Sequence, residues 1–216
     1  IAEGIDPKDI FVTGNTVIDA LKSAIKMLKD NKKLRKVHEA FFNFIDPNKR
    51  LILVTGHRRE NFGNGFNAIC TALANLSKRD DIDIVYPVHL NPNVKKLVYE
   101  KLGNKTNIHL IEPLDYLPFV HLMERCYLVL TDSGGIQEEA PSLGKPVLVM
   151  RDVTERPEAV KAGTVKLVGA NTSNITKECT HLLDNETAYK IMSQAHNPYG
   201  NGKAASHIIK ELVRDL

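Results

Sequence analysis

The residues best suited to chemistry form the segment Thr131–Ala140 (TDSGGIQEEA), which follows a short apolar run. Ser133 is placed to cap the helix that begins there, and Gly134 and Gly135 leave the first amides of that helix without side-chain cover. Bare amides and the helix dipole together attract phosphate. Glu139, one turn later, is placed to reach back and hydrogen-bond sugar hydroxyls. We therefore favour a nucleotide site over the alternative, a tight strand–helix turn with a capping box.

A second polar segment, Thr55–Gly63 (TGHRRENFG), follows another apolar run. The imidazole of His57 and the guanidinium groups of Arg58 and Arg59 suit a polyanionic ligand, and His57 is also able to transfer a proton. The alternative is a solvated basic loop in which Glu60 pairs with an arginine, as surface charge clusters usually do. In a parallel sheet this loop would share an edge with the glycine-rich segment, which favours the ligand site.

Two further polar segments follow apolar runs. In Met150–Glu158, Arg151 and Arg156 are candidates for contacts with phosphate or hydroxyl groups, and the alternative is ordinary loop chemistry before a helix. His89 also follows a run, where a lone histidine is more often structural than catalytic. Two aromatic residues are most simply core, although a ring at a sheet edge is also able to stack on a base: Tyr116 and Phe119.

Composition argues against several classes of protein. The 216 residues include 29 basic and 26 acidic side chains, and a net charge of +3 gives no sign of a nucleic-acid or membrane surface. Three cysteines without a CxxC pair argue against a disulfide framework and indicate a reducing cytoplasm. No histidine pair has metal-ligand spacing, and no apolar run approaches the ~20 residues of a membrane span, so we predict no metal and no membrane segment. The glycine spacing predicts neither NAD nor ATP.

Six short apolar runs alternate with helical patterns along the chain. Each run is rich in Val, Ile or Leu with little alternation, which is typical of strands buried on both faces. Asn91 before Pro92 is placed to cap one of the intervening helices. The alternation predicts an α/β fold with a Rossmann-like, doubly wound parallel sheet. The predicted strands are Leu51–Thr55, Ile82–Val88, Asn107–Ile111, Tyr127–Thr131, Pro146–Met150 and Thr164–Val168.

The sequence patterns at the two ends of the chain predict helices and no strands. We divide the chain into a helical lead-in at 1–45, a Rossmann-like core at 46–170 and C-terminal helices at 171–216. Ligands of such sheets bind beyond the carboxyl ends of the strands, so we expect the polar segments to share one edge. The chain opens at Ile1 rather than Met, and we expect it to be a fragment. The predicted terminal helices are Thr16–Asp30, Lys33–Phe44, Ser173–Asp184, Glu186–Ala195 and Lys203–Asp215.

Seven segments, taken together and in order, resemble the non-hydrolysing UDP-N-acetylglucosamine 2-epimerases. The resemblance implies the GT-B-type fold, in which two Rossmann-like domains face each other across a cleft. This chain resembles the C-terminal half, the domain that binds UDP, and the blocks of the first domain are absent from it. The segments are Val12–Asp19, Thr55–Gly63, Tyr86–Pro92, Leu130–Val149, Arg151–Val160, Ala162–Gly169 and Asn197–Gly202.

The resemblance also implies a reaction. The family interconverts UDP-GlcNAc and UDP-ManNAc by eliminating UDP to give 2-acetamidoglucal and then adding UDP back. It consumes no cofactor, neither NAD nor a metal. The implied partners are UDP-GlcNAc, UDP-ManNAc, UDP and, for the full-length protein, a second copy in a homodimer. The principal acid–base carboxylates of the family lie on the first domain, so we expect the fragment alone to be inactive.

Five residues of this chain match family positions that hold the nucleotide. By resemblance, Ser133, Gly134 and Gly135 contact the diphosphate, and Arg156 reaches the phosphates. Glu139 is implied to bind the ribose hydroxyls. These assignments agree with the chemistry expected of a glycine-rich helix start.

Four more residues have implied roles in substrate binding. Phe119 resembles the uracil contact, and His57 resembles a substrate-site residue that could act as acid or base. Arg58 and His89 resemble contacts to a second, activating UDP-GlcNAc. The chain departs from the family at Leu114, near the expected base pocket, where some relatives carry a polar side chain.

Three alternatives use the same nucleotide site. A GT-B-type glycosyltransferase would need an acceptor site, and a hydrolysing epimerase would release UDP and free ManNAc. A nucleotide-sugar sensor without chemistry is the third alternative, and it belongs to a different functional class. Assays of transfer product and of free UDP would separate them.

Overall fold

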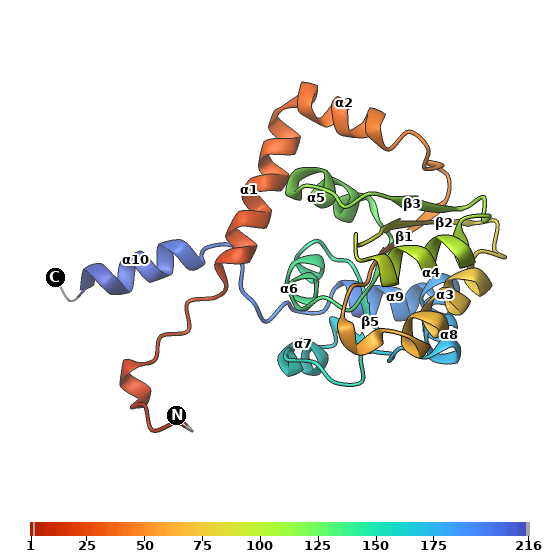
Figure 1. The fold of residues 1–216 in the computed structure, drawn as a ribbon. Coiled ribbons are helices and arrows are strands. Elements are labelled where there is room, and N and C mark those ends of the chain that lie inside the picture. The colour runs from red at the N-terminus through yellow and green to blue at the C-terminus, as the bar shows by residue number, and fades with distance from the viewer. Residues whose placement is uncertain (2, 215–216) are drawn as a thin grey trace.

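The computed structural model describes residues 1 and 3–214, and a six-stranded sheet lies at its centre (Figure 1). All neighbouring strands are parallel, in the order β3-β2-β1-β4-β5-β6, which confirms the predicted α/β fold. Each strand bound lies within one residue of its prediction. The strands are β1 (Arg50–Thr55), β2 (Ile82–Pro87), β3 (Ile108–Ile111), β4 (Leu128–Thr131), β5 (Val147–Val149) and β6 (Val165–Leu167).

Helices follow every strand, and further helices occupy both ends of the chain. Asn91 caps α4 with Pro92 at its first position, as predicted. The α-helices are α1 (Thr16–Asp30), α2 (Lys32–Phe41), α3 (Asn64–Leu76), α4 (Pro92–Leu102), α5 (Tyr116–Arg125), α6 (Gly134–Ser142), α7 (Pro157–Ala162), α8 (Thr172–Asp184), α9 (Glu186–Ser193) and α10 (Ala204–Arg214), and the 3-10 turns are η1 (Pro7–Asp9) and η2 (Arg59–Asn61).

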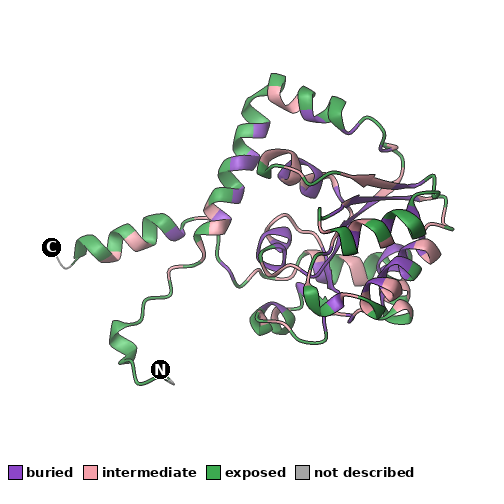
Figure 2. Cartoon of the chain, in the orientation of Figure 1, coloured by how far each residue is buried: buried purple, intermediate pink, exposed green. Residues whose placement is uncertain are grey.

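Alternate strand residues build a separate core on each face of the sheet. Ile52 and Val54 of β1 belong to the core with α3, α4, α8 and α9, whereas Leu51 and Leu53 belong to the core with α1, α5, α6 and α7. Burial is continuous from Ile136 to Pro141 of α6, and Figure 2 draws most of this helix as buried. The buried part anchors the helix beside the sheet, whereas Gly135 in its first turn is exposed.

Several helix ends differ from the prediction by one to three residues, and α9, for example, ends at Ser193 rather than at Ala195. The second helix stops at Phe41, not at the predicted Phe44, because Phe42 leaves the helix and is fully buried. The predicted end of the last helix, Asp215, lies outside the described residues.

The lead-in helix α1 packs on the sheet-containing core. Its residues Ile18, Leu21 and Leu28 are fully buried, in the core shared with α5 and α6. Asp19 accepts hydrogen bonds from the amides of Ala204 and Ala205, at the start of α10. Figure 1 shows both chain ends extending from the foot of α1, away from the sheet. The three-part division of the chain stays a prediction.

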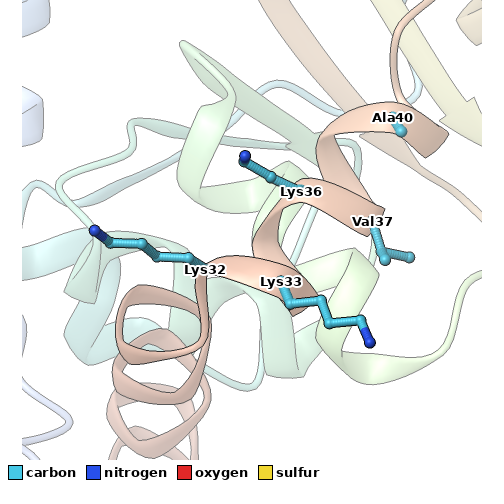
Figure 3. A pocket seen from close by; sticks show the side chains of 5 residues that line it. All are labelled: Lys32, Lys33, Lys36, Val37 and Ala40. Carbon is cyan, nitrogen blue, oxygen red and sulfur yellow. The ribbon is translucent and has the colours of Figure 1, made fainter.

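A surface hollow of about 530 Å³ lies beside α2. Figure 3 shows the amino groups of Lys32 and Lys33 pointing in opposite directions, so the hollow lacks the converging charges of an anion site. Among the described residues, no helix is both long and apolar enough to cross a membrane. The hollow is lined by residues of one helix: Lys32, Lys33, Lys36, Val37 and Ala40.

Two buried histidines connect α2 to α5. The ring centroids of His38 and His121 are 5.8 Å apart, and the His121 ring stacks on Phe42 at 5.9 Å. Within the described part of the chain, Nδ1 of each histidine is buried without a hydrogen-bond partner. Burial, followed by the nearby charge of Arg35, lowers the pKa of His121, so folding disfavours the protonated form of this ring.

We expect the free energy of unfolding to fall as the pH drops below the ordinary histidine pKa of 6.5. The unfolded chain then binds a proton that the folded chain resists at His121, so protonation favours unfolding. His121→Phe removes the titrating group but keeps a stacked ring, and should reduce this pH dependence. Urea denaturation at a series of pH values above and below 6.5 measures the pH dependence of the free energy of unfolding. His181→Gln, on an exposed position of α8, should leave the slope unchanged, and an unchanged slope in His121→Phe would contradict the assignment.

Candidate functional site

The candidate site lies at the sheet edge where the loops after β1, β4 and β5 meet. These strands are neighbours, and since the whole sheet is parallel their carboxyl ends share this edge. The chain leaves β1 toward β2 on one side and leaves β4 toward β5 on the other, so the strand order reverses between β1 and β4. Open α/β sheets bind their ligands at such a switch point.

Asp132, the residue after β4, attaches the loop after β1 to this edge. Its side chain is fully buried, and Oδ2 accepts hydrogen bonds from the amides of His57 (3.0 Å) and Arg58 (2.8 Å). The side-chain amide of Asn61 also donates to Oδ2, at 3.3 Å. A buried carboxylate needs such donors, so Asp132 fixes the positions of His57 and Arg58.

The start of α6 lies between two guanidinium groups. A Cβ added to Gly134 would lie 3.9 Å from Nη2 of Arg58 and 4.0 Å from Nη2 of Arg156. Ser133 occupies the predicted N-cap position, but within the described structure its hydroxyl makes no capping hydrogen bond, and its amide donates to Oγ1 of Thr131 at 2.9 Å. Bare glycine backbone at a helix N-terminus, with a cation on either side, is suited to an anion.

Arg156 is anchored by its neighbours before any ligand binds. Its Nε donates to Oε1 of Glu138, and its Nη1 donates to the Glu155 carbonyl at 3.1 Å. Its amide donates to Oγ1 of Thr154 at 3.1 Å. The hydrogen bond to Glu138 raises the pKa of Arg156, so the guanidinium keeps its charge. One third of the side chain remains exposed, at 33%.

Glu139 faces the first turn of α6 and is held there by α5. Its Oε1 lies 3.8 Å from the Cβ position of Gly135, and its Oε2 accepts a hydrogen bond from the Tyr116 hydroxyl at 2.8 Å. Burial raises the pKa of Glu139, against the opposite effect of that hydrogen bond. Phe119, one turn after Tyr116, is half-buried and packs on the core. Oε1 is therefore the oxygen of Glu139 that faces the glycine backbone.

His57 and His89 stack on each other at the end of β1 and β2. Their ring centroids are 5.7 Å apart with an interplanar angle of 18°. Nδ1 of His57 lies 3.5 Å from Oδ1 of Asp132, and the His57 side chain is 45% exposed. The structure thus brings His89 to His57, while Arg58, which the sequence analysis grouped with His89, lies beside Gly134.

Arg151 is not available to a ligand, which corrects its prediction as a phosphate or hydroxyl contact. Its side chain is 5% exposed, and Nε donates to Glu60 at 2.6 Å. Nη1 and Nη2 donate to Glu155 at 2.6 and 3.0 Å, and these bonds lower the pKa of Glu155 to about 2. Glu60 pairs with an arginine, which was predicted by the alternative interpretation of Thr55–Gly63 as a solvated basic loop. The pair connects the loops after β1 and β5.

The sequence analysis missed the residues that orient the site. Asp132 and Glu138 flank the predicted phosphate contacts in the sequence. An acidic residue next to a predicted anion site would repel the anion, so its presence there signals that the acid binds a neighbouring hydrogen-bond donor. Asn15 donates from Nδ2 to Oε2 of Glu138 at 2.7 Å, although 123 residues separate the two. Among the described residues, no group of three or more His, Cys, Asp or Glu side chains could hold a metal ion.

Comparison with known proteins gives a consistent result. The family model described as UDP-N-acetylglucosamine 2-epimerase matches residues 1–213. The UDP-N-acetylglucosamine 2-epimerase of Escherichia coli strain K12 is 58% identical over 213 residues, which are 98% of this chain and 57% of that protein. This chain therefore spans about 57% of the length of the relative that it matches.

Solved structures of UDP-GlcNAc 2-epimerases share the fold. The UDP-GlcNAc 2-epimerase of Neisseria meningitidis, bound to UDP-GlcNAc, is 50% identical with a TM-score of 0.94, over 99% of this chain and 57% of that chain. The UDP-GlcNAc 2-epimerase of Methanocaldococcus jannaschii, in complex with UDP-GlcNAc and UDP, is 35% identical with a TM-score of 0.81. The match covers 99% of this chain and 57% of that chain.

Asp132→Asn should destabilise the protein by about 1–3 kcal/mol, because the new amide group would face donors that now reach a carboxylate. Urea denaturation measures the free energy of unfolding. Asp80→Asn, at an exposed position, makes the same chemical change and should stay within about 0.5 kcal/mol of the unmodified chain. Equal stability of the two variants would show that Asp132 does not hold the loop.

Proposed function

The chain belongs to the UDP-N-acetylglucosamine 2-epimerase family, and we propose that it supplies the UDP-binding half of an enzyme that interconverts UDP-GlcNAc and UDP-ManNAc. The observation that carries the proposal is the convergence of Arg58 and Arg156 on Gly134 at the start of α6. Two cations at a helix N-terminus suit a diphosphate, which carries its charge on several oxygens.

The remaining side chains fit the rest of a uridine nucleotide. With the diphosphate at Gly134, Oε1 of Glu139 stands beside the first turn of α6, where a ribose hydroxyl would donate to it. Tyr116 orients that carboxylate, and Phe119 on the same helix supports the proposed uracil contact. Gly135 through its backbone amide and Ser133 through its hydroxyl complete the proposed diphosphate cradle, because the Ser133 amide already donates to Thr131.

The proposed reaction breaks the bond between the sugar C1 and the diphosphate oxygen as a proton leaves C2. UDP then adds back after the proton returns to the opposite face. Arg58 and Arg156 would stabilise the charge that develops on the leaving diphosphate, and the anchored position of Arg156 would reduce reorganisation at that moment. His57, partly exposed and close to Asp132, is the proposed proton-transfer group of this chain.

The carboxylates of this edge are already engaged by other groups. Asp132 accepts from backbone amides, Glu138 binds Arg156, and Glu139 binds Tyr116. We therefore propose that the principal acid–base groups lie outside these 216 residues. An activating UDP-GlcNAc near Arg58 and His89, a homodimer and a cytoplasmic location stay predictions of the family resemblance.

We expect the chain to bind UDP saturably in calorimetric titration and to bind ADP much more weakly. Arg156→Ala and Glu139→Ala should each weaken UDP binding about tenfold or more, because each removes a charged hydrogen-bond partner. Gly134→Ala should fold normally, since its Cβ meets only ordinary contacts, yet the methyl group would stand between the two guanidiniums and block the phosphate. Normal UDP affinity in Gly134→Ala would contradict the proposed phosphate position.

We expect these 216 residues alone to bind UDP but not to convert UDP-GlcNAc into UDP-ManNAc, because the principal acid–base groups are proposed to lie outside them. Chromatography of the nucleotide sugars after incubation measures conversion, and the amount of free UDP tests for hydrolysis. Formation of UDP-ManNAc by this chain would show that its own residues supply the base.

A further inference from the structure

Two segments remote in sequence from the candidate site meet at one of its residues, Glu138. Oε2 of Glu138 accepts the hydrogen bond from Nδ2 of Asn15, the residue that precedes α1. Asn197, in the corner before α10, donates from its Nδ2 to the Glu138 carbonyl at 3.0 Å. The two segments also bind each other, since the Asn15 amide donates to the Tyr199 carbonyl at 2.9 Å.

Glu138 in turn binds the arginine of the site. Its side chain is only 7% exposed, and its two oxygens have different partners, Oε1 with Arg156 and Oε2 with Asn15. A carboxylate held at both oxygens cannot turn without breaking one bond, so it presents Oε1 in one direction. The corner before α10 adds a second restraint, because the Tyr199 hydroxyl donates to Glu158 of α7, the helix that follows Arg156, at 2.8 Å.

The charge of Glu138 opposes the binding of an anion. A carboxylate next to a diphosphate repels it, and glutamine in the same place would be electrostatically better. The carboxylate is therefore explained by what it does to Arg156: a charged hydrogen bond that aims the guanidinium.

We propose that Glu138 is a positioning residue for Arg156, and that Asn15 fixes the Glu138 carboxylate, so that the start of α1 sets the geometry of the phosphate subsite. This inference rests on the proposed function, in which Arg156 contacts the diphosphate. It assigns to Asn15 a role that its place in the sequence does not indicate.

Asn15 offers a variant that separates the two roles of its side chain. Its Oδ1 caps α1 by accepting from the Val17 amide at 3.0 Å, whereas its Nδ2 serves Glu138. Asn15→Ser keeps a good cap but loses the donor to Glu138. Asn31→Ser is the matched control, because Asn31 caps α2 in the same way through the Leu34 amide at 3.0 Å.

The measurement compares UDP with uridine, which lacks the phosphates, by NMR titration of the full chain. We expect Asn15→Ser to raise the dissociation constant of UDP about fivefold and Glu138→Gln about tenfold, with uridine changed less than about twofold. Asn31→Ser should change neither. Tighter UDP binding by Glu138→Gln would mean that its charge matters only as repulsion, and would overturn the proposal.

Two further outcomes separate this inference from the proposed function. If the unmodified chain does not bind UDP, or if Arg156→Ala leaves UDP affinity unchanged, the proposed function fails. If Arg156→Ala weakens UDP binding but Asn15→Ser and Glu138→Gln do not, only the positioning role fails. Equal loss of UDP and uridine in Asn15→Ser would show a general structural effect, and would also overturn the positioning role.

Discussion

The sheet edge that carries the site depends on one buried carboxylate. Asp132 places a negative charge at the end of β4 with no exposure to water, which is tolerable only while donors surround it. The donors come from the loop after β1, through the amides of His57 and Arg58 and the side chain of Asn61. Satisfying Asp132 therefore fixes the loop that carries the imidazole and one of the two guanidinium groups.

Acidic side chains hold both arginines of the site before a ligand arrives. Glu138 binds Arg156, and Glu155 lies 4.0 Å from Nη1 of Arg58 while it also binds Arg151. Each acid removes part of the charge that attracts an anion, so the helix N-terminus must supply the rest. In return the hydrogen-bonded guanidinium of Arg156 is oriented in advance, which would reduce the entropy lost on binding an anion.

The fold was predictable because six apolar runs that must be buried on both faces leave few other arrangements. The location of the candidate site was predictable, since polar segments after parallel strands share one edge. The hydrogen-bond partners of the individual charged side chains were not predictable. Arg151 and Arg156 have the same side chain, yet Arg151 follows the fully buried Met150 and points to Glu60 and Glu155. Only the packed structure distinguishes them.

Neighbouring glutamates in α6 show how one helix divides two tasks. Successive helical residues point about 100° apart, so Glu138 meets Arg156 and Asn15 while Glu139 meets Tyr116 on another side. The contact with Asn15 requires the two terminal segments to lie very close together. Gly14 and Gly200 allow this, with φ of +90° and +109° that other residues rarely adopt, and a Cβ on Gly200 would lie 3.3 Å from Cα of Gly14. These glycines therefore allow the close approach of the two segments that carry Asn15 and Tyr199.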